Sequence, residues 1–301
     1  MRALLVYNPL ATVTTAAVAD IVTKALAVDL RLDAEATQRR GHASELAARA
    51  ANNGYEIVIA LGGDGTVNEA MQGVAGTQVR LAIIPGGSTN VLARTLGLPN
   101  DPIKAASVVL RKLRERKDRR INLGVANDRY FGFCAGWGYD ALVVRLVEQR
   151  PRMKRAVRQA AFLWCGLLAL LRSRNDRVTI ALEAENTPTQ EALRAIVCGN
   201  SNPYTFLGPV PARMCPQANL ELGLDVTGLT TLGYLAIARV MVRTLTGDQV
   251  GQLGHVRLWH DHRSYEAQAN GPLHLHVDGE PMGETNHLSL RSAPRALSVI
   301  A

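Results

Sequence analysis

The sequence predicts an α/β protein with a doubly wound, Rossmann-like first domain and a mainly β, sandwich-like second domain. Three observations support this prediction. The chain has 301 residues, a length that suits two domains. Short apolar runs alternate with amphipathic helical patterns over the first 125 residues, as in a parallel sheet joined by crossover helices. After residue 120, strand patterns follow one another between Pro, Gly and Asn turns, which indicates a β-rich region.

The expected elements of the first domain alternate regularly along the chain. Apolar β-type runs predict strands over 2–7, 30–34, 56–61 and 80–84. The run over 56–61, EIVIAL, is typical of a parallel strand that is buried on both faces. Helical spacing of apolar residues predicts helices over 14–28, 42–52 and 101–114, and another that begins near Thr66.

The second domain is expected to consist mostly of strands. They are predicted over 121–125, 129–135, 177–185, 192–198, 255–261, 265–269, 273–278 and 287–291, with helical inserts over 139–171 and 231–245. The predicted boundaries are therefore 1–122 for the α/β domain and 123–294 for the β-rich domain. We expect the segment 295–301 to return to the first domain as a strand.

Positive charge is concentrated in two segments of the chain. The formal net charge is +8, yet segment 111–120 alone carries +5 and segment 145–177 carries +7. Basic patches attract nucleic acid or an anionic membrane surface, but no nucleic-acid-binding motif accompanies these two, so nucleic acid is not expected as a partner. The apolar run 160–171 is flanked by arginines, which is typical of a helix that lies on a membrane surface. A core helix with basic ends explains the same pattern equally well.

Several features indicate the compartment. The longest apolar run has twelve residues, whereas a bilayer span needs about 20. Asn8-Pro9 interrupts the apolar N-terminal stretch before a signal sequence could form. The cysteines (Cys134, Cys165, Cys198 and Cys215) show neither a disulfide framework nor zinc spacing. We expect a cytoplasmic protein that is peripheral to the membrane.

A glycine-rich loop follows the strand predicted over 56–61. Its three glycines let the backbone take unusual φ values and let a phosphate approach the N–H groups closely, and the following helix presents its positive end to an anion. Asp64 can hold a magnesium ion that bridges phosphate oxygens. Thr66 and Glu69 also form a capping-box pattern, which explains these two residues without a ligand but leaves the glycines unexplained. The segment reads Gly62-Gly63-Asp64-Gly65-Thr66-Val67-Asn68-Glu69.

Two further loops follow predicted strands. The strand over 80–84 runs into Gly86-Gly87 and then into hydroxyl and amide side chains, Ser88-Thr89-Asn90; an N-capped helix that ends at Gly97 is the alternative. Asn8-Pro9 follows the first strand, and only this position suggests that it takes part in a binding site. Open α/β sheets bind ligands at the carboxyl ends of their strands, so these loops predict a phosphate site there.

These segments, taken in order, resemble the diacylglycerol kinase catalytic domain family, which includes bacterial lipid kinases and the sphingosine kinases. Beyond the loops above, the resemblance rests on further segments: Thr37 with Gly41-His42-Ala43, Ala93-Arg94 with Leu96-Gly97-Leu98-Pro99, Gly136-Trp137-Gly138-Tyr139-Asp140-Ala141, and Val277-Asp278-Gly279-Glu280. It implies a nucleotide site made by Asn8, Pro9, Thr37, Gly62, Gly63, Asp64, Gly65, Thr66, Asn68, Glu69, Gly87, Ser88 and Asn90.

The resemblance also implies a reaction. The γ-phosphoryl group of ATP would pass, with Mg²⁺, to a lipid hydroxyl, most readily that of diacylglycerol, with a sphingoid base as the other acceptor. Asp278 and Glu280 would supply the base, since an ionised carboxylate takes the proton of the attacking hydroxyl; which of the two does so stays open. A simple hairpin turn also explains Asp278-Gly279. We interpret His274 and His276 as ordinary strand residues. Candidate linings for the lipid tail are 204–211 and the helix over 162–171.

The chain departs from the family pattern at three places. Leu10-Ala11-Thr12 follows Asn8-Pro9 where the family has a glycine or a nearby lysine, and Val91 stands where an Asp is expected. Asp225 lies in a shortened version of a family segment that holds a structural magnesium, so a second metal site there is a weak expectation. An NAD kinase or sugar kinase, or an inactive ATP-binding protein at the membrane surface, remain alternatives. A homodimer is left open.

Overall fold

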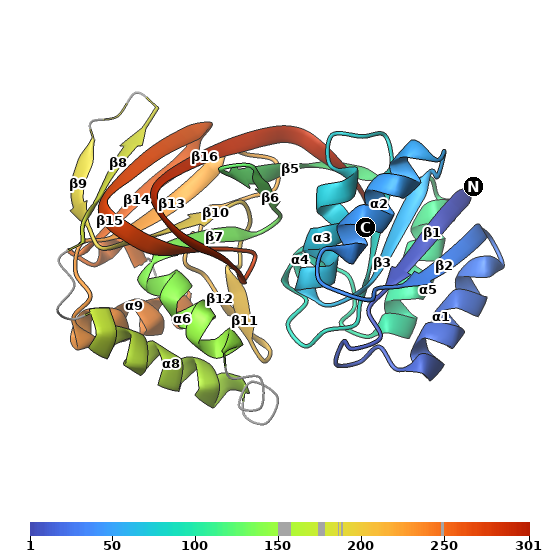
Figure 1. The fold of residues 1–301 in the computed structure, drawn as a ribbon, viewed down its shortest axis with the longest axis horizontal. Helices are drawn as coiled ribbons and strands as arrows, with labels where there is room; N and C mark the ends of the chain where they lie inside the picture. Colours follow the sequence, from blue (N-terminus) through green and yellow to red (C-terminus); the bar gives the residue numbers. More distant parts are fainter. Residues whose placement is uncertain (150–157, 174–177, 186, 188, 248–249) are drawn as a thin grey trace. The chain divides into compact units, whose positions relative to one another are not determined.

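The computed structural model describes residues 1–149, 158–173, 178–185, 187, 189–247 and 250–301. The chain divides into two compact units, Met1–Leu123 with Ala293–Ala301, and Gly124–Ser292. The mixed α/β organisation of the first unit and the β-rich organisation of the second confirm the predicted fold class (Figure 1).

The first unit is built on a parallel sheet. Its strand order is β2-β1-β3-β4, and the last three residues of β16 pair with β4, also in parallel. The strands are β1 (Arg2–Tyr7), β2 (Arg31–Ala36), β3 (Ile57–Gly62) and β4 (Arg80–Pro85). The strand order reverses between β1 and β3: β2 lies on one side of β1, and the next strand, β3, lies on the other. Such a reversal is where doubly wound sheets bind ligands.

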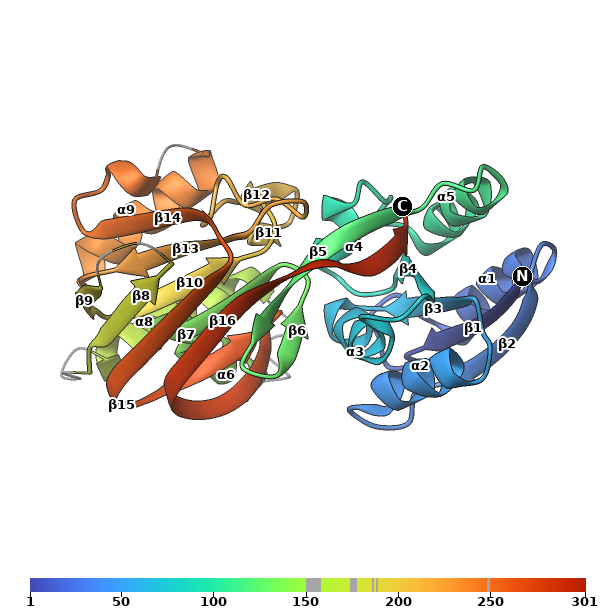
Figure 2. The ribbon, with the colours of Figure 1, turned by 90° about the horizontal axis from the view of Figure 1, so that it is seen from above.

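Helices cover both faces of this sheet (Figure 2). They are α1 (Ala16–Ala27), α2 (His42–Asn52), α3 (Asp64–Val74), α4 (Val91–Thr95) and α5 (Pro102–Arg114). Buried residues of α1 and α5 share one apolar cluster with alternate residues of the strands, while α2 and α3 pack on the other face. Two-sided burial accounts for the near-continuous apolar runs in β1, β3 and β4.

The second unit is an antiparallel sheet that folds over into two layers. Its order is β14-β13-β10-β7-β15-β16, with β8 beside β15 and β9 beside β8. The first half of β15 pairs with β8 and the second half with β7, and its register to β16 shifts between Gln268 and Leu273. The strands are β5 (Arg119–Ala126), β6 (Arg129–Phe131), β7 (Cys134–Gly138), β8 (Ile180–Ala184), β9 (Gln190–Leu193), β10 (Ala195–Gly199), β11 (Thr205–Leu207), β12 (Val210–Ala212), β13 (Leu224–Leu229), β14 (Val256–His262), β15 (Ser264–Val277) and β16 (Glu280–Ile300).

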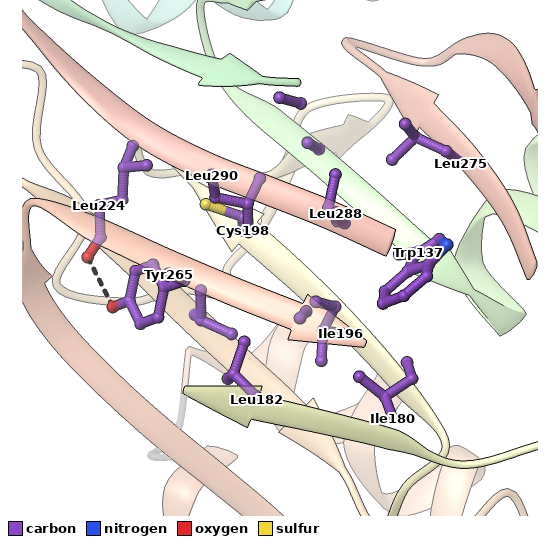
Figure 3. Close-up of a cluster of buried hydrophobic side chains, with 14 of the residues drawn as sticks. Trp137, Ile180, Leu182, Ile196, Cys198, Leu224, Tyr265, Leu275, Leu288 and Leu290 are labelled. Carbon is purple, nitrogen blue, oxygen red and sulfur yellow. Dashed lines mark hydrogen bonds between the residues drawn. The ribbon is translucent and has the colours of Figure 1, made fainter. Parts of the chain in front are cut away.

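The core of this second unit lies between the two layers (Figure 3). Trp137 of β7 and Tyr265 of β15 are its largest buried side chains, and both polar ends are satisfied. The Tyr265 hydroxyl donates to the carbonyl of Leu224 at 2.9 Å, and the Trp137 indole N–H donates to the carbonyl of Leu273 at 3.2 Å. Burial of these large apolar surfaces is the main force that holds the two layers together.

Three longer helices pack on one side of this unit: α6 (Tyr139–Glu148), α8 (Arg158–Ser173) and α9 (Tyr234–Thr246). The short helix η1 (Val250–Gln252) lies near α9. The insert predicted over 139–171 thus contains α6 and α8, and residues 150–157 lie outside the described part. No helix in the described segments is long and apolar enough to cross a bilayer.

Some predicted elements differ from the observed ones. The strand predicted over 192–198 is two strands, β9 and β10, separated at Arg194, and Ala192 has a positive φ of 61°. Strand β13 was not predicted, because Asp225 and Gly228 interrupt its apolar pattern. The strands predicted over 287–291 and 295–301 are parts of one strand, β16, which carries the chain from the second unit back to the first.

Candidate active site

The loops singled out in the first unit meet at one edge of its sheet. Asn8, Thr37 and Gly86 each follow the carboxyl end of a strand, and each donates its backbone N–H to a neighbouring strand end. The bonds run to Leu61 at 3.1 Å, to Tyr7 at 2.8 Å and to Gly62 at 2.7 Å. The predicted phosphate loops are therefore neighbours in space.

The two glycine loops pack against each other so closely that side chains are excluded. A Cβ on Gly87 would lie 2.6 Å from the Cα of Gly63, and one on Gly86 would lie 3.1 Å from the Cα of Gly62. A Cβ on Gly62 would lie 2.7 Å from the Cβ of Thr66. The glycines thus serve backbone-to-backbone packing, and they leave Gly63 and Gly87 only partly covered, with Ser88 beside them exposed.

Asp64 and Asn90 join these loops. A carboxylate oxygen of Asp64 accepts the N–H of Val91 at 2.6 Å. Asn90, which is buried and has a positive φ of 51°, accepts the N–H of Gly87 at 3.0 Å and donates to the carbonyl of Gly87 at 2.8 Å and to Asn100 at 2.6 Å. Asn90 therefore shapes the loop. Val91, which departs from the family pattern, is buried and contributes its backbone N–H.

The capping-box alternative for Thr66 and Glu69 is wrong. Helix α3 begins at Asp64, its N-cap is Gly63, and no side chain caps it. Thr66 lies inside the helix, where its hydroxyl accepts from the Asn8 amide at 3.4 Å, and Asn68 is buried beside Gln72.

Glu69 instead caps a different helix. Its carboxylate accepts the N–H of Gly41 at 2.8 Å and of Ala43 at 3.2 Å, at the beginning of α2. Local sequence spacing could not reveal this contact, because the two helices are far apart in the chain. The predicted segments Gly41-His42-Ala43 and 62–69 are thereby joined.

We expect Glu69→Ala to destabilise the first unit by about 1–2 kcal/mol, because two N–H groups of α2 lose their acceptor. The segment around Thr37 and Gly41 would loosen with them. Urea unfolding measures the loss of stability. The exposed residue Glu45 of the same helix α2 offers a control, Glu45→Ala; an equal loss of stability in both variants would contradict the capping role.

In the second unit, Asp278 lies in the hairpin turn between β15 and β16. Asp278 and Gly279 have positive φ values of 48° and 77°, and Val277 pairs with Glu280, so the hairpin-turn interpretation of Asp-Gly describes the backbone correctly. The Asp278 carboxylate is buried and accepts three backbone N–H groups, from Gly132 at 2.7 Å and from Phe133 and Cys134 at 3.0 Å each. This geometry gives Asp278 a structural role and argues against it as the base. Glu280, the first residue of β16, is only partly buried.

Three residues of the second unit that were not predicted as site residues form a polar cluster. His276 is fully buried, and its Nε2 lies 2.6 Å from a carboxylate oxygen of Asp140. The Tyr204 hydroxyl donates to Asp140 at 2.8 Å. Burial and the Asp140 charge raise the pKa of Tyr204 well above its ordinary value, so this hydroxyl keeps its proton. His276 lies on strand β15, as expected, and its side chain also takes part in this cluster. Asp140 already stood in a motif segment, and Tyr204 begins the segment 204–211 that was named as a candidate lining for the lipid tail.

Asp225, the weakly expected second magnesium ligand, is engaged by protein groups. It is buried and accepts from His260 Nδ1 at 2.8 Å and from the N–H of Asp261 at 3.0 Å. Among the described residues, no three His, Cys, Asp or Glu side chains are grouped to hold a metal ion. The donor set around Asp225 therefore does not fit a structural magnesium.

Asp225 predicts a pH effect on stability. Burial raises its pKa above the ordinary value, so the folded protein binds this proton more tightly than the unfolded chain. The stabilisation is complete below the unfolded pKa of about 3.9 and is lost as pH rises through the folded pKa. We expect the free energy of unfolding of the wild type, relative to Asp225→Asn, to fall as pH rises above about 4. Urea unfolding at several pH values measures it; a constant difference would contradict the prediction.

The second unit also contains a pocket of about 350 Å³, whose lining includes Gly138, Tyr139 and His274. Arg145 crosses it to contact His274 at 2.7 Å and Glu284 at 3.3 Å. Burial, followed by the charge of Arg145, lowers the pKa of His274. None of the predicted site residues lines this pocket.

Comparisons with known proteins cover nearly the whole chain. A family model described as the diacylglycerol kinase catalytic domain matches residues 2–124, and one described as the YegS C-terminal NAD kinase beta sandwich-like domain matches residues 134–301. A diacylglycerol kinase from Staphylococcus aureus is 34% identical over 297 residues, which cover 96% of this chain and 90% of the relative. A protein from Pseudomonas putida named "Probable lipid kinase YegS-like" is 30% identical and covers 88% of this chain and 84% of its own length.

Solved structures extend the likeness to three dimensions. A crystal structure of a diacylglycerol kinase from Bacillus anthracis superposes with a TM-score of 0.73 at 19% identity and covers 99% of this chain and 96% of its own. At this identity the superposition supports the fold alone.

Proposed function

The chain belongs to the bacterial diacylglycerol and lipid kinase family, whose members are phosphotransferases, and from this membership we propose that it transfers the γ-phosphoryl group of ATP to the hydroxyl of diacylglycerol. The Staphylococcus aureus relative named diacylglycerol kinase, 34% identical over 96% of this chain, is the observation that carries the choice of acceptor. The finding of a lipid kinase family makes an NAD kinase or a sugar kinase the weaker alternative.

The packed glycine loops support the donor side of the proposal. Gly63 and Gly65 are partly exposed and carry no side chain at the edge of the sheet, and α3 begins at Asp64. Backbone N–H groups at the start of a helix are a favourable site for phosphate oxygens. We propose that this edge holds the phosphates of ATP, with Thr37 and the Asn8-Pro9 loop beside them.

Asp64 is the residue that fits a magnesium ion. Mg²⁺ in phosphoryl transfer is usually held by one or two carboxylates together with phosphate oxygens and water, and Asp64 is a partly exposed carboxylate beside the glycine loops. When bound, the ion would neutralise charge on the phosphates. The residues of this chain would position the donor.

We propose that Glu280 acts as the base. As the acceptor oxygen bonds to the γ-phosphorus, the bond from that phosphorus to the bridging oxygen breaks and ADP leaves; Glu280 would take the hydroxyl proton. The three backbone N–H groups that Asp278 accepts support the choice of Glu280 over Asp278. Asp140, whose side chain is 23% exposed, would accept a hydrogen bond from the acceptor and orient it.

We propose that α8 brings the enzyme to the membrane. Trp164, Leu167 and Leu171 are 53%, 41% and 52% exposed and lie on one side of this helix, and the helix carries arginines but no acidic residue. An apolar face with cationic flanks suits an anionic bilayer surface. Residues 150–157 and 174–177, which hold much of the predicted basic patch, lie outside the described part.

Transfer of label from γ-labelled ATP tests the proposal. The acceptors are vesicles that contain diacylglycerol, monoacylglycerol or sphingosine, with or without an anionic phospholipid, and NAD in a parallel reaction. We expect labelled phosphatidate, formed faster on anionic vesicles than on neutral ones. Labelled NAD, or label only on sphingosine, would overturn the proposed acceptor. Bound ATP with no labelled product would favour an inactive binding protein.

A further inference from the structure

His276 connects two parts of the second unit that the proposed reaction uses. It lies on β15 opposite Gly136 of β7 and has no solvent exposure. Its Nε2 contacts Asp140 at 2.6 Å, and its Nδ1 contacts the N–H of Gly279 at 3.3 Å. A backbone N–H can only donate, so Nδ1 must be the acceptor. The proton of the neutral ring is therefore on Nε2, where it is donated to Asp140.

The carboxylate of Asp140 is held from two directions. The Tyr204 hydroxyl contacts both of its oxygens, at 2.8 Å and 2.9 Å, and His276 contacts one of them. The side chain nevertheless keeps 23% of its surface exposed. A carboxylate that is fixed by two donors, the buried His276 and the partly buried Tyr204, and still reaches solvent has one orientation before any ligand arrives.

No side chain fits at position 136 beside this pair. A Cβ on Gly136 would lie 2.3 Å from the Asp140 carboxylate and 2.4 Å from His276 Nε2, so the two side chains occupy the volume that any other residue at 136 would need. On the other side of the ring, Gly279 belongs to the turn that directly precedes Glu280. The imidazole therefore holds the Asp140 carboxylate and also the backbone turn that leads to Glu280.

We propose that His276 is a positioning residue for phosphoryl transfer: it orients Asp140 toward the acceptor hydroxyl and, through the Gly279 N–H, sets the direction of Glu280. This inference rests on the proposed function. His276 does not touch the acceptor itself, because it is buried. Its contribution depends on a neutral ring with the proton on Nε2, since a proton on Nδ1 would face the N–H of Gly279, donor against donor.

Kinetics of four variants test the inference, with the lipid that the wild type labels as acceptor. We expect His276→Leu to lower kcat by about 10- to 100-fold, because displaced reacting groups cost that much, and to leave the KM for ATP unchanged. His276→Gln, whose amide can donate to Asp140 and accept from Gly279, should recover most of the rate. Asp140→Asn combined with His276→Leu should lose little more than Asp140→Asn alone, since residues that act through one another are not additive.

Any of three results would overturn the proposal. The first is an unchanged kcat in His276→Leu, the second is a kcat in His276→Gln no higher than in His276→Leu, and the third is a double variant whose loss of kcat is the product of the two single losses. A purely structural role would lower the amount of folded enzyme and leave kcat per folded molecule intact. A wild type that labels no lipid would remove the proposed function and this inference together, whereas a wild type that labels lipid at a rate indifferent to residue 276 would remove this inference alone.

A measurement on the wild type avoids the risk that a variant fails to fold. The ¹⁵N spectrum of the histidine rings at neutral pH should show His276 with its proton on Nε2 and a bare Nδ1. Assignment of the opposite tautomer, or of a doubly protonated ring, would overturn the hydrogen-bond arrangement on which the proposal depends.

Discussion

Replacement of Gly87 by alanine is expected to lower kcat/KM for ATP by about 100-fold, because the new methyl group would force apart the loops that hold the phosphates. Its Cβ would lie 2.6 Å from the Cα of Gly63, a backbone atom, and 2.9 Å from Oδ1 of Asn90, which is itself bonded to Gly87. The same strain should lower the free energy of unfolding by about 1–3 kcal/mol. Steady-state kinetics over a range of ATP concentrations and urea unfolding measure the two effects.

Gly254→Ala is the matched control for this substitution. A Cβ at Gly254 would meet nothing within 4 Å and its φ is not positive, so kinetics and stability should both stay close to the wild type. A Gly87→Ala protein that binds ATP normally would show that the contact between the two loops does not shape the donor site.

Glu280→Gln and Asp278→Asn are expected to fail in different ways. Glu280→Gln should lower kcat by about 10²- to 10⁴-fold with little change in stability, because a positioned base is lost. Asp278→Asn places an amide where a carboxylate accepts three N–H groups, so at least one buried donor loses its partner, at a cost of about 1–3 kcal/mol. A loss of kcat at full stability would indicate a catalytic role, and a loss of stability in urea unfolding would indicate that the residue supports the turn.

Glu284→Gln controls for the removal of a carboxylate from the same strand. Glu284 lies four residues after Glu280 and contacts Arg145 and His274 at the surface, so its loss should leave kcat unchanged. If Asp278→Asn abolished turnover at full stability while Glu280→Gln remained active, the two roles would have to be exchanged.

The sequence was most informative where function and backbone geometry impose the same residues. Each glycine loop follows a strongly apolar strand, and the resemblance depends on the same glycines that exclude side chains between Gly63 and Gly87. Strands β1, β3 and β4 could be predicted for a related reason, since burial on both faces demands a continuous apolar run.

Contacts between distant segments could not be predicted in this way. The Glu69 pattern fitted a local cap, yet its partner is a helix that begins 27 residues earlier, at His42. The cluster of Asp140, Tyr204 and His276 comes from three segments whose proximity only the folded β-rich unit creates. Strand β13 was missed because its buried Asp225 finds a partner in His260, which spacing along the chain cannot show.

Strand β16 has a consequence for biosynthesis. Its residues Ser298–Ile300 pair with β4 in the parallel sheet, with Ser298 opposite Arg80, although the whole second unit lies between these positions in the chain. A ribosome must therefore make the β-rich unit before the sheet of the α/β unit can be completed. Until then β4 presents an open edge of unpaired backbone groups, the kind of surface at which nascent chains associate wrongly. A chain that stops before residue 298 would be expected to aggregate through the α/β unit, even though every glycine loop had already been made.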